Sequence, residues 1–489
     1  MAHGGVYAGS RLVNALISFL LIPLYAHLLG DDGYGVISLM MIVTSVGQVL
    51  MGQGLGGAWY RLRFEYEGAA GLRRFETSVI WYMVGSIAVL VGLSALLGPW
   101  VVEKLTPGVG FYPYWFLALL TAGGMALVDL YFRKQQALQR PVGFAIFSAL
   151  RSALIPGGIV LFMVALGRGA SGKLEGEALA EWLLAVLALW LLRPGGLGEF
   201  RWGEVRRSLA YGLPLVGHQL AAIMNNLIDQ FLVNGYLGLA ATGVYAMGYK
   251  VASASALVAV TLNQAFSPLF MSALKESERA RGAGEAERAR RSLESVARAA
   301  VLLLVVVACG ALVLTALGRE LLAVLATGEF GGSWRVLALV SAGEVVMGGY
   351  LAVSGAVFYH VRRVRLMPLL TVAAAGVNVV ANVLMIPRFG IMGAAWATLL
   401  SNAVLFGATM LVAQWSVAIP HRWGQWGWVM GATGVALAGL WVVDAVLWPW
   451  WLRLGVKVLI AGVAIVVMLW RTHCRMRDLK RLWGGKKAE

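Results

Sequence analysis

The chain has 489 residues, of which 60% are hydrophobic and only 13% are charged. A soluble globular protein has about 25% charged residues, so this chain lacks the polar side chains needed to cover a water-exposed surface. Its net charge of +16 falls in short clusters between apolar runs, which is typical of a membrane protein and argues against a nucleic-acid-binding one.

Apolar runs separated by charged or Gly/Pro-rich breaks predict an all-α polytopic membrane protein with about fourteen transmembrane helices. In chain order the predicted spans cover residues 8–29, 35–58, 77–98, 113–133, 142–166, 177–192, 209–236, 241–271, 293–317, 335–360, 366–386, 391–416, 425–446 and 450–470. The first run is expected to be a retained span, because the residues before it do not resemble a signal peptide.

The distribution of Lys and Arg predicts the orientation. If the N-terminus is cytoplasmic, the inner loops and the C-terminal tail hold 28 of these cations and the outer side holds seven. Because cytoplasmic loops are enriched in Lys and Arg, both termini are expected to lie in the cytoplasm, in the inner (plasma) membrane of the cell.

A Gly-rich turn occurs twice at the same spacing. Gly30 and Gly35 connect the first two spans, and Gly238 and Gly243 connect the seventh and eighth, 208 residues later in both cases. Six spans separate the two turns, so the repeat is parallel. We therefore expect two pseudo-symmetric six-helix lobes arranged in a V, residues 1–200 and 201–418, followed by residues 419–489 with the last two spans and a basic tail.

The sequence shows no enzyme signature. It has no phosphate-binding loop of the P-loop type, no zinc spacing among its six histidines and no catalytic triad pattern. The two cysteines, one in an apolar run and one in the basic tail, are not expected to pair. We expect a transporter, with no catalytic residue, no metal and no cofactor.

Charged residues near the middle of a predicted span need a partner or an aqueous cavity, since each costs about 2.5–3.5 kcal/mol to insert. Arg151 has no acid nearby on its own helix, so an anion site is our interpretation. Glu344 is also alone on its span, and is the candidate for coupling to protons or sodium. Asp229 and Lys250 lie at similar depth on adjacent helices, which permits either a structural ion pair or one that opens during transport.

Other polar residues in the spans are candidates for the substrate cavity or for coupling, and each also has a structural explanation. Arg11 and Arg298 are near the cytoplasmic ends, where long side chains reach the headgroups, and Asp129 precedes Arg133 by one helical turn. Three more could line a cavity or hold helices together: His218, Asn378 and Asn382.

Three segments resemble one family. Residues 19–61 are similar to the opening of the oligosaccharide flippases, residues 209–271 to the start of their second lobe, and residues 371–402 to their late Asn, Ile-Pro, Gly-Ala-Ala signature. This is the Wzx-like polysaccharide transporter branch of the multidrug/oligosaccharidyl-lipid/polysaccharide exporter superfamily. In position, Asp229 and Lys250 match a recurring Asp and Lys of this branch, whereas Arg151 has no counterpart in its motifs.

The resemblance implies a flippase for undecaprenyl-diphosphate-linked oligosaccharide repeat units, which move to the periplasmic leaflet by alternating access for surface polysaccharide synthesis. It implies that cavity cations bind the diphosphate and that acidic residues couple transport to protons or sodium. It also points to a polysaccharide polymerase, a chain-length regulator and membrane lipid as partners.

Two other functions are alternatives to a flippase. A cation-coupled multidrug antiporter of the related branch is expected to have an acid in its first span, where this chain has Arg11 and no acid before Asp31. A membrane-embedded glycan polymerase is expected to have a large periplasmic loop, whereas the longest outer loop here is the short stretch 167–176.

Overall fold

The computed structural model describes residues 16–66, 68–192, 199–326, 328–359, 363–446 and 448–472. Every regular element in these ranges is helical, and ten of the helices are long and apolar enough to cross a membrane. The expected all-α membrane fold is therefore confirmed. The count of fourteen spans stays a prediction.

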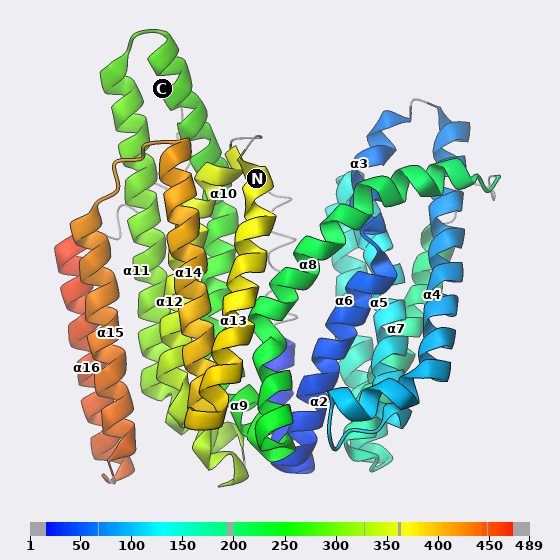
Figure 1. Ribbon diagram of the computed structural model, residues 1–489, viewed down its shortest axis with the longest axis horizontal. Helices are drawn as coiled ribbons and strands as arrows, with labels where there is room; N and C mark the ends of the chain where they lie inside the picture. Colours follow the sequence, from blue (N-terminus) through cyan, green and yellow to red (C-terminus); the bar gives the residue numbers. More distant parts are fainter. Residues whose placement is uncertain are drawn as a thin grey trace. The chain divides into compact units, whose positions relative to one another are not determined.

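The chain forms two compact units (Figure 1). Unit 1 comprises Met1–Ala246 and Leu325–Phe330, and unit 2 comprises Met247–Val324 and Gly331–Glu489. The division falls inside helix α9, whereas the sequence places the lobe boundary at residues 200 and 201. The three predicted lobe ranges remain a prediction.

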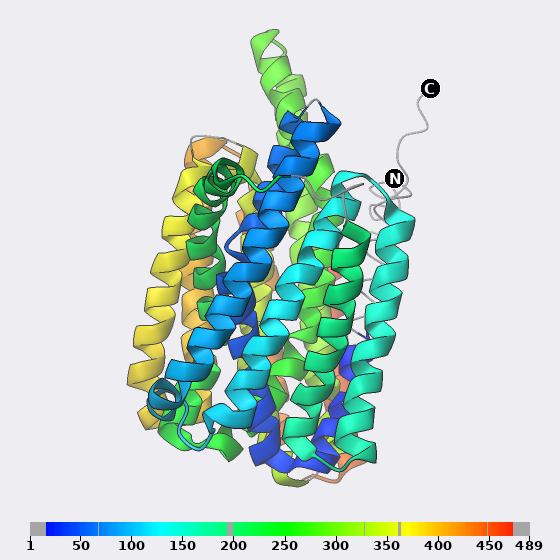
Figure 2. The ribbon, with the colours of Figure 1, turned by 90° about the vertical axis from the view of Figure 1, so that its right-hand side faces the viewer.

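The helices of unit 1 pack side by side (Figure 2). They enclose an apolar core built from α3, α4, α5 and α7, with Trp59 and Phe75 among its fully buried side chains. The helices are α2 (Ile22–Gly52), α3 (Leu55–Leu62), α4 (Ala69–Leu105), α5 (Phe116–Ala137), α6 (Pro141–Ile159), α7 (Gly169–Leu192) and α8 (Trp202–Leu237). Helix α8 contains Pro214 and changes direction along its length (Figure 1).

The two repeated turns have the same backbone conformation. Gly30 adopts φ 65° and ψ −171° at a kink in α2, and Gly238 adopts φ 85° and ψ −178° between α8 and α9 (Leu239–Ala252). Only glycine occupies this region of φ at low cost. The residues five positions later, Gly35 and Gly243, lie against each other, and a Cβ on either would fall within 2.3 Å of a backbone oxygen.

Unit 2 is built around α11 (Ala286–Leu325), whose apolar side chains from Val301 to Leu312 are buried by the surrounding helices. Those helices are α10 (Ala254–Gly282), α12 (Trp334–Tyr359), α13 (Met367–Phe389), α14 (Ile391–Ser416), α15 (Trp423–Ala445) and α16 (Trp450–Thr472). Helices α10 and α11 continue past the ends of α12–α14 as a two-helix hairpin (Figure 1). Four salt bridges with exposed arginines lie along this hairpin, as expected for a solvated segment.

Candidate functional site

Arg151 on α6 pairs with Glu181 on α7. Its Nε and Nη2 atoms donate to the same carboxylate oxygen, Glu181 Oε1, at 2.8 Å and 2.5 Å. The helices approach closely because Gly158 and Gly176 meet backbone to backbone, where a Cβ would lie 2.6 Å or less from the facing chain. The Glu181 side chain is 2% exposed and that of Arg151 is 26% exposed.

This pair gives Arg151 a counter-charge from another helix. The sequence contains no acid near Arg151 on its own helix, but α7 supplies one from 30 residues away. One cation faces one carboxylate, so the charge of the guanidinium group is balanced before any other anion binds. The second carboxylate oxygen of Glu181 is buried and has no hydrogen-bond partner among the residues that the structure describes.

Asp229 is buried in α8 and accepts hydrogen bonds from the Tyr245 hydroxyl and from the backbone N–H of Gln230. Tyr245 belongs to the same unit, and is itself fully buried. Lys250 is half-buried on α9, within unit 2. The pairing of Asp229 with Lys250 remains a prediction.

Glu344 lies buried within α12. Among the residues that the structure describes, it has no ion pair and no hydrogen bond to its carboxylate. The adjacent Gly343 carbonyl accepts a hydrogen bond from Asn402 of α14 at 3.2 Å. An unpaired carboxyl group inside a membrane helix is able to exchange a proton or hold a small cation.

Asn378 and Asn382 form a fully buried polar stripe on α13. The Asn382 amide donates to the Asn378 backbone carbonyl and side-chain oxygen, both at 2.9 Å. On the neighbouring α14, Ser401 donates to the Ala374 carbonyl of α13 at 2.9 Å. These bonds favour the helix-packing interpretation, although in the described part of the chain the Asn378 Nδ2 and Asn382 Oδ1 atoms have no hydrogen-bond partner.

The remaining sequence candidates lie at separate places. The predicted pair of Asp129 and Arg133 is present, at 3.1 Å on α5. Arg298 is exposed on α11, and His218 is half-buried on α8, where no described residue forms a hydrogen bond with its Nδ1 atom. Arg11 lies outside the described residues.

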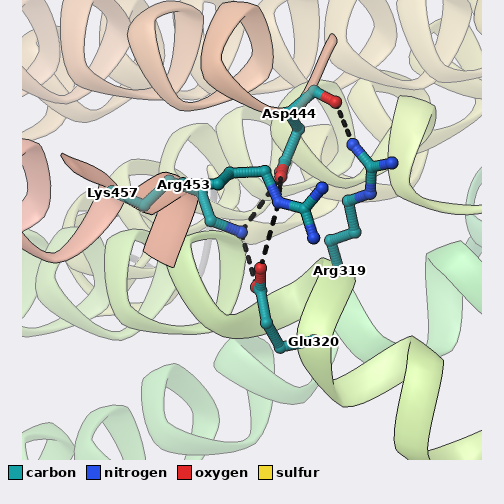
Figure 3. Close-up of polar contacts among 5 residues, drawn as sticks. All are labelled: Arg319, Glu320, Asp444, Arg453 and Lys457. Atoms are coloured by element: carbon teal, nitrogen blue, oxygen red, sulfur yellow. Dashed lines mark hydrogen bonds and ion pairs between the residues drawn. The ribbon is translucent and has the colours of Figure 1, made fainter. Parts of the chain in front are cut away.

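Sequence reasoning missed a larger group of charges in unit 2, shown in Figure 3. We call it the ionic network; it consists of Arg319, Glu320, Asp444, Arg453 and Lys457. Lys457 Nζ lies 2.5 Å from Glu320 Oε2 and 3.0 Å from Asp444 Oδ1. Arg453 Nε lies 3.3 Å from Glu320 Oε1 and 3.7 Å from Asp444 Oδ1.

The network joins the end of α11 to the hairpin formed by α15 and α16. Lys457 is fully buried, and Arg319 donates to the backbone carbonyl of Asp444. A signal for it exists in the sequence, since Asp444 and Lys457 lie at similar depth on two helices joined by a short loop. What the sequence lacks is the third helix, because α11 is more than 100 residues away.

Comparison with known proteins gives a consistent picture. Residues 24–326 match the family described as polysaccharide biosynthesis protein. A protein of Haemophilus influenzae, Lsg locus putative protein 1, is 23% identical over 283 residues, which are 56% of this chain and 66% of that protein. The chain thus matches just under two thirds of that relative's length.

Solved structures show the same fold. The lipid II flippase MurJ in an inward closed conformation aligns with a TM-score of 0.72 at 14% identity, over 98% of this chain and 100% of that one. A multidrug resistance MATE family transporter of the MOP superfamily, in an inward-facing conformation, has a TM-score of 0.60 at 13% identity, over 83% of this chain and 94% of its own. The MATE transporter VcmN of Vibrio cholerae has a TM-score of 0.54 at 16% identity, over 86% and 98%.

Proposed function

Because the chain belongs to the polysaccharide biosynthesis protein family, we propose that it moves undecaprenyl-diphosphate-linked oligosaccharide repeat units from the cytoplasmic to the periplasmic leaflet. The expected membership in the flippase branch of the MOP superfamily is confirmed by this match and by the fold, and a transporter, not an enzyme, is the class that both indicate. The glycan-lipid substrate and the alternating-access mechanism are our proposals.

The extent of the fold match is the observation that favours a flippase over a drug antiporter. The flippase structure covers 98% of this chain, whereas the two multidrug transporters cover 83% and 86%. Nearly every residue of this chain therefore aligns with the flippase structure, whereas roughly one residue in seven has no counterpart in the multidrug transporters.

The α15–α16 hairpin supports a substrate with a lipid tail. An apolar groove of about 1010 Å³ runs along it, lined on α15 by residues including Gly424, Gly427 and Gly431 and on α16 by residues including Val463 and Val467. The three glycines leave open space where side chains would project. A polyprenyl chain fits such a groove without desolvating any polar group.

The diphosphate requires a cation, because it cannot cross hydrocarbon bare. We assign this role to Arg151, whose guanidinium group binds phosphate oxygens bidentately when Glu181 releases it. Glu344 is the proposed coupling residue, because a lone buried carboxyl group changes its charge by taking up one proton.

The experiment that tests the proposal deletes the gene in its host. Surface polysaccharide and the lipid-diphosphate-linked repeat unit are quantified together, with drug susceptibility as the control. We expect surface polymer to be lost while repeat units accumulate in the cytoplasmic leaflet. Intact polymer with new drug sensitivity would instead assign the chain to the multidrug branch.

A further inference from the structure

The ionic network contains more positive than negative side chains. Arg319, Arg453 and Lys457 face the two carboxylates of Glu320 and Asp444. Within the described residues, Arg319 has no salt bridge to a carboxylate, and its bonds are to the Asp444 backbone carbonyl and to the face of Trp334. One positive charge is therefore left without a counter-charge.

The surplus charge has hydrogen-bond donors to offer. Glu320 uses one oxygen for Arg453 and the other for Lys457, so its acceptors are already engaged. Of the five N–H donors of Arg453, only Nε has a hydrogen-bond acceptor in the described part of the chain. Figure 3 shows the guanidinium groups of Arg319 and Arg453 on the same side of Asp444. Two like charges brought together with unused donors form the usual binding arrangement for a phosphate group.

The network also lies at the depth of lipid headgroups. Arg453 follows the exposed Trp450 and Trp451 by less than one helical turn, and the exposed Trp448 lies in the loop just before them. Tryptophans of this kind mark the membrane–water interface. Lys457 is seven residues beyond Trp450, or about 10 Å along the helix, on the apolar side of this level.

We propose that the ionic network binds a phosphate anion at the membrane interface, held by Arg319 and Arg453 and supplied by the headgroup of an anionic phospholipid. The phosphate provides the missing negative charge, and its oxygens accept hydrogen bonds from the guanidinium N–H groups that have no other acceptor. The positioning residues are Lys457, Glu320 and Asp444, which hold the two arginines in place. This site is separate from the proposed diphosphate site at Arg151, which lies in unit 1.

The test uses the delipidated full-length protein in detergent and follows its thermal unfolding. The probes are dioleoyl phosphatidylglycerol, dioleoylglycerol without a phosphate, and inorganic phosphate. We expect phosphatidylglycerol to raise the Tm in a saturable way, and dioleoylglycerol to have no such effect. Saturation by inorganic phosphate at a similar concentration would support the anion site and assign a soluble source to the phosphate.

Variants locate the effect. Arg319→Gln is expected to weaken the apparent affinity for phosphatidylglycerol at least tenfold. Arg319→Lys keeps the positive charge but cannot donate two parallel hydrogen bonds, and is expected to weaken the affinity several-fold. The matched control is Arg335→Gln, since Arg335 is an exposed arginine beside the same Trp334 ring but outside the network. Equal affinity in Arg319→Gln and Arg335→Gln, or equal stabilisation by dioleoylglycerol, would overturn the proposal.

Discussion

The Arg151–Glu181 pair and the ionic network differ in their balance of charge. On α6 and α7, Arg151 meets a single carboxylate, so its positive charge is already balanced. The ionic network contains three cations and two carboxylates, so one positive charge is not balanced. The depth of a cation in the membrane therefore does not reveal what it binds. The number of opposite charges that the neighbouring helices bring to it is more informative.

The largest expected effect concerns the balanced pair. Arg151→Ala should reduce transport of the lipid-linked glycan to background while the amount of inserted protein is unchanged, because the diphosphate loses its cation. The measurement is accumulation of repeat units in a deletion strain complemented with the variant.

Glu181→Gln supplies the comparison for this prediction. It removes the competitor but keeps the shape of the side chain, so purified protein should bind undecaprenyl diphosphate several-fold more tightly. Normal transport by Arg151→Ala would remove Arg151 from the diphosphate site, and unchanged affinity in Glu181→Gln would show that the two anions do not compete.

In the network the main expected effect is on stability. Asp444→Asn leaves the fully buried Lys457 with one carboxylate in place of two, and breaking a buried charge arrangement in this way typically costs about 3–5 kcal/mol. The expected result is a clearly lower Tm of the full-length protein in detergent. The double variant Asp444→Asn/Lys457→Met should recover part of the loss; a double variant as unstable as the single one would show that the charges are not coupled.

A buried group at the other end of the α15–α16 hairpin gives a pH-dependent comparison. The His421 ring contacts the rings of Trp423 and Trp426, and within the described ranges neither of its nitrogens has a hydrogen-bond partner. Burial lowers the pKa of His421 from 6.5 to about 4. The unfolded chain therefore binds a proton more readily than the folded one. Stability contributed by the neutral ring is present above pH 6.5 and is lost as the pH falls towards 4, by up to about 3 kcal/mol.

This prediction is checked by the Tm at pH 7 and at pH 5. His421→Phe keeps an aromatic ring that cannot take up a proton, and should show a smaller Tm difference between the two pH values. An identical difference in the variant and the parent would assign the pH dependence to other groups.

The smallest effect is expected at an exposed pair. Arg290 and Glu294 are one turn apart on the α10–α11 hairpin. Arg290 Nε lies 3.1 Å from Glu294 Oε1, and both side chains are exposed to solvent. Arg290→Gln should change the free energy of unfolding by no more than about 0.5 kcal/mol, because such pairs are screened. A larger change in Tm would indicate that this hairpin packs against something other than water.

The sequence predicts the local part of this architecture well. Apolar runs predict most of the helices, and the pair of Asp129 with Arg133 is identified by helical spacing alone, since the two residues are one turn apart. The partners of Arg151 and Lys457 could not be found in the same way. Glu181 and Glu320 reach them from other helices, and one sequence does not state which faces of two helices meet. Glu181 is a charged residue within the predicted span 177–192, and its carboxylate supplies the counter-charge for Arg151.

The contact between Gly35 and Gly243 has a consequence for the ancestry of the chain. In a symmetric dimer the only residues that meet their own equivalents are those on the two-fold axis. Gly35 and Gly243 are equivalent positions of the predicted repeat, and they touch within one compact unit. A single-repeat ancestor would thus have dimerised through this glycine, and one mutation there would have created two clashes at once. Fusion of two such copies would free each glycine to mutate independently, yet the backbones leave no room for a side chain at either position.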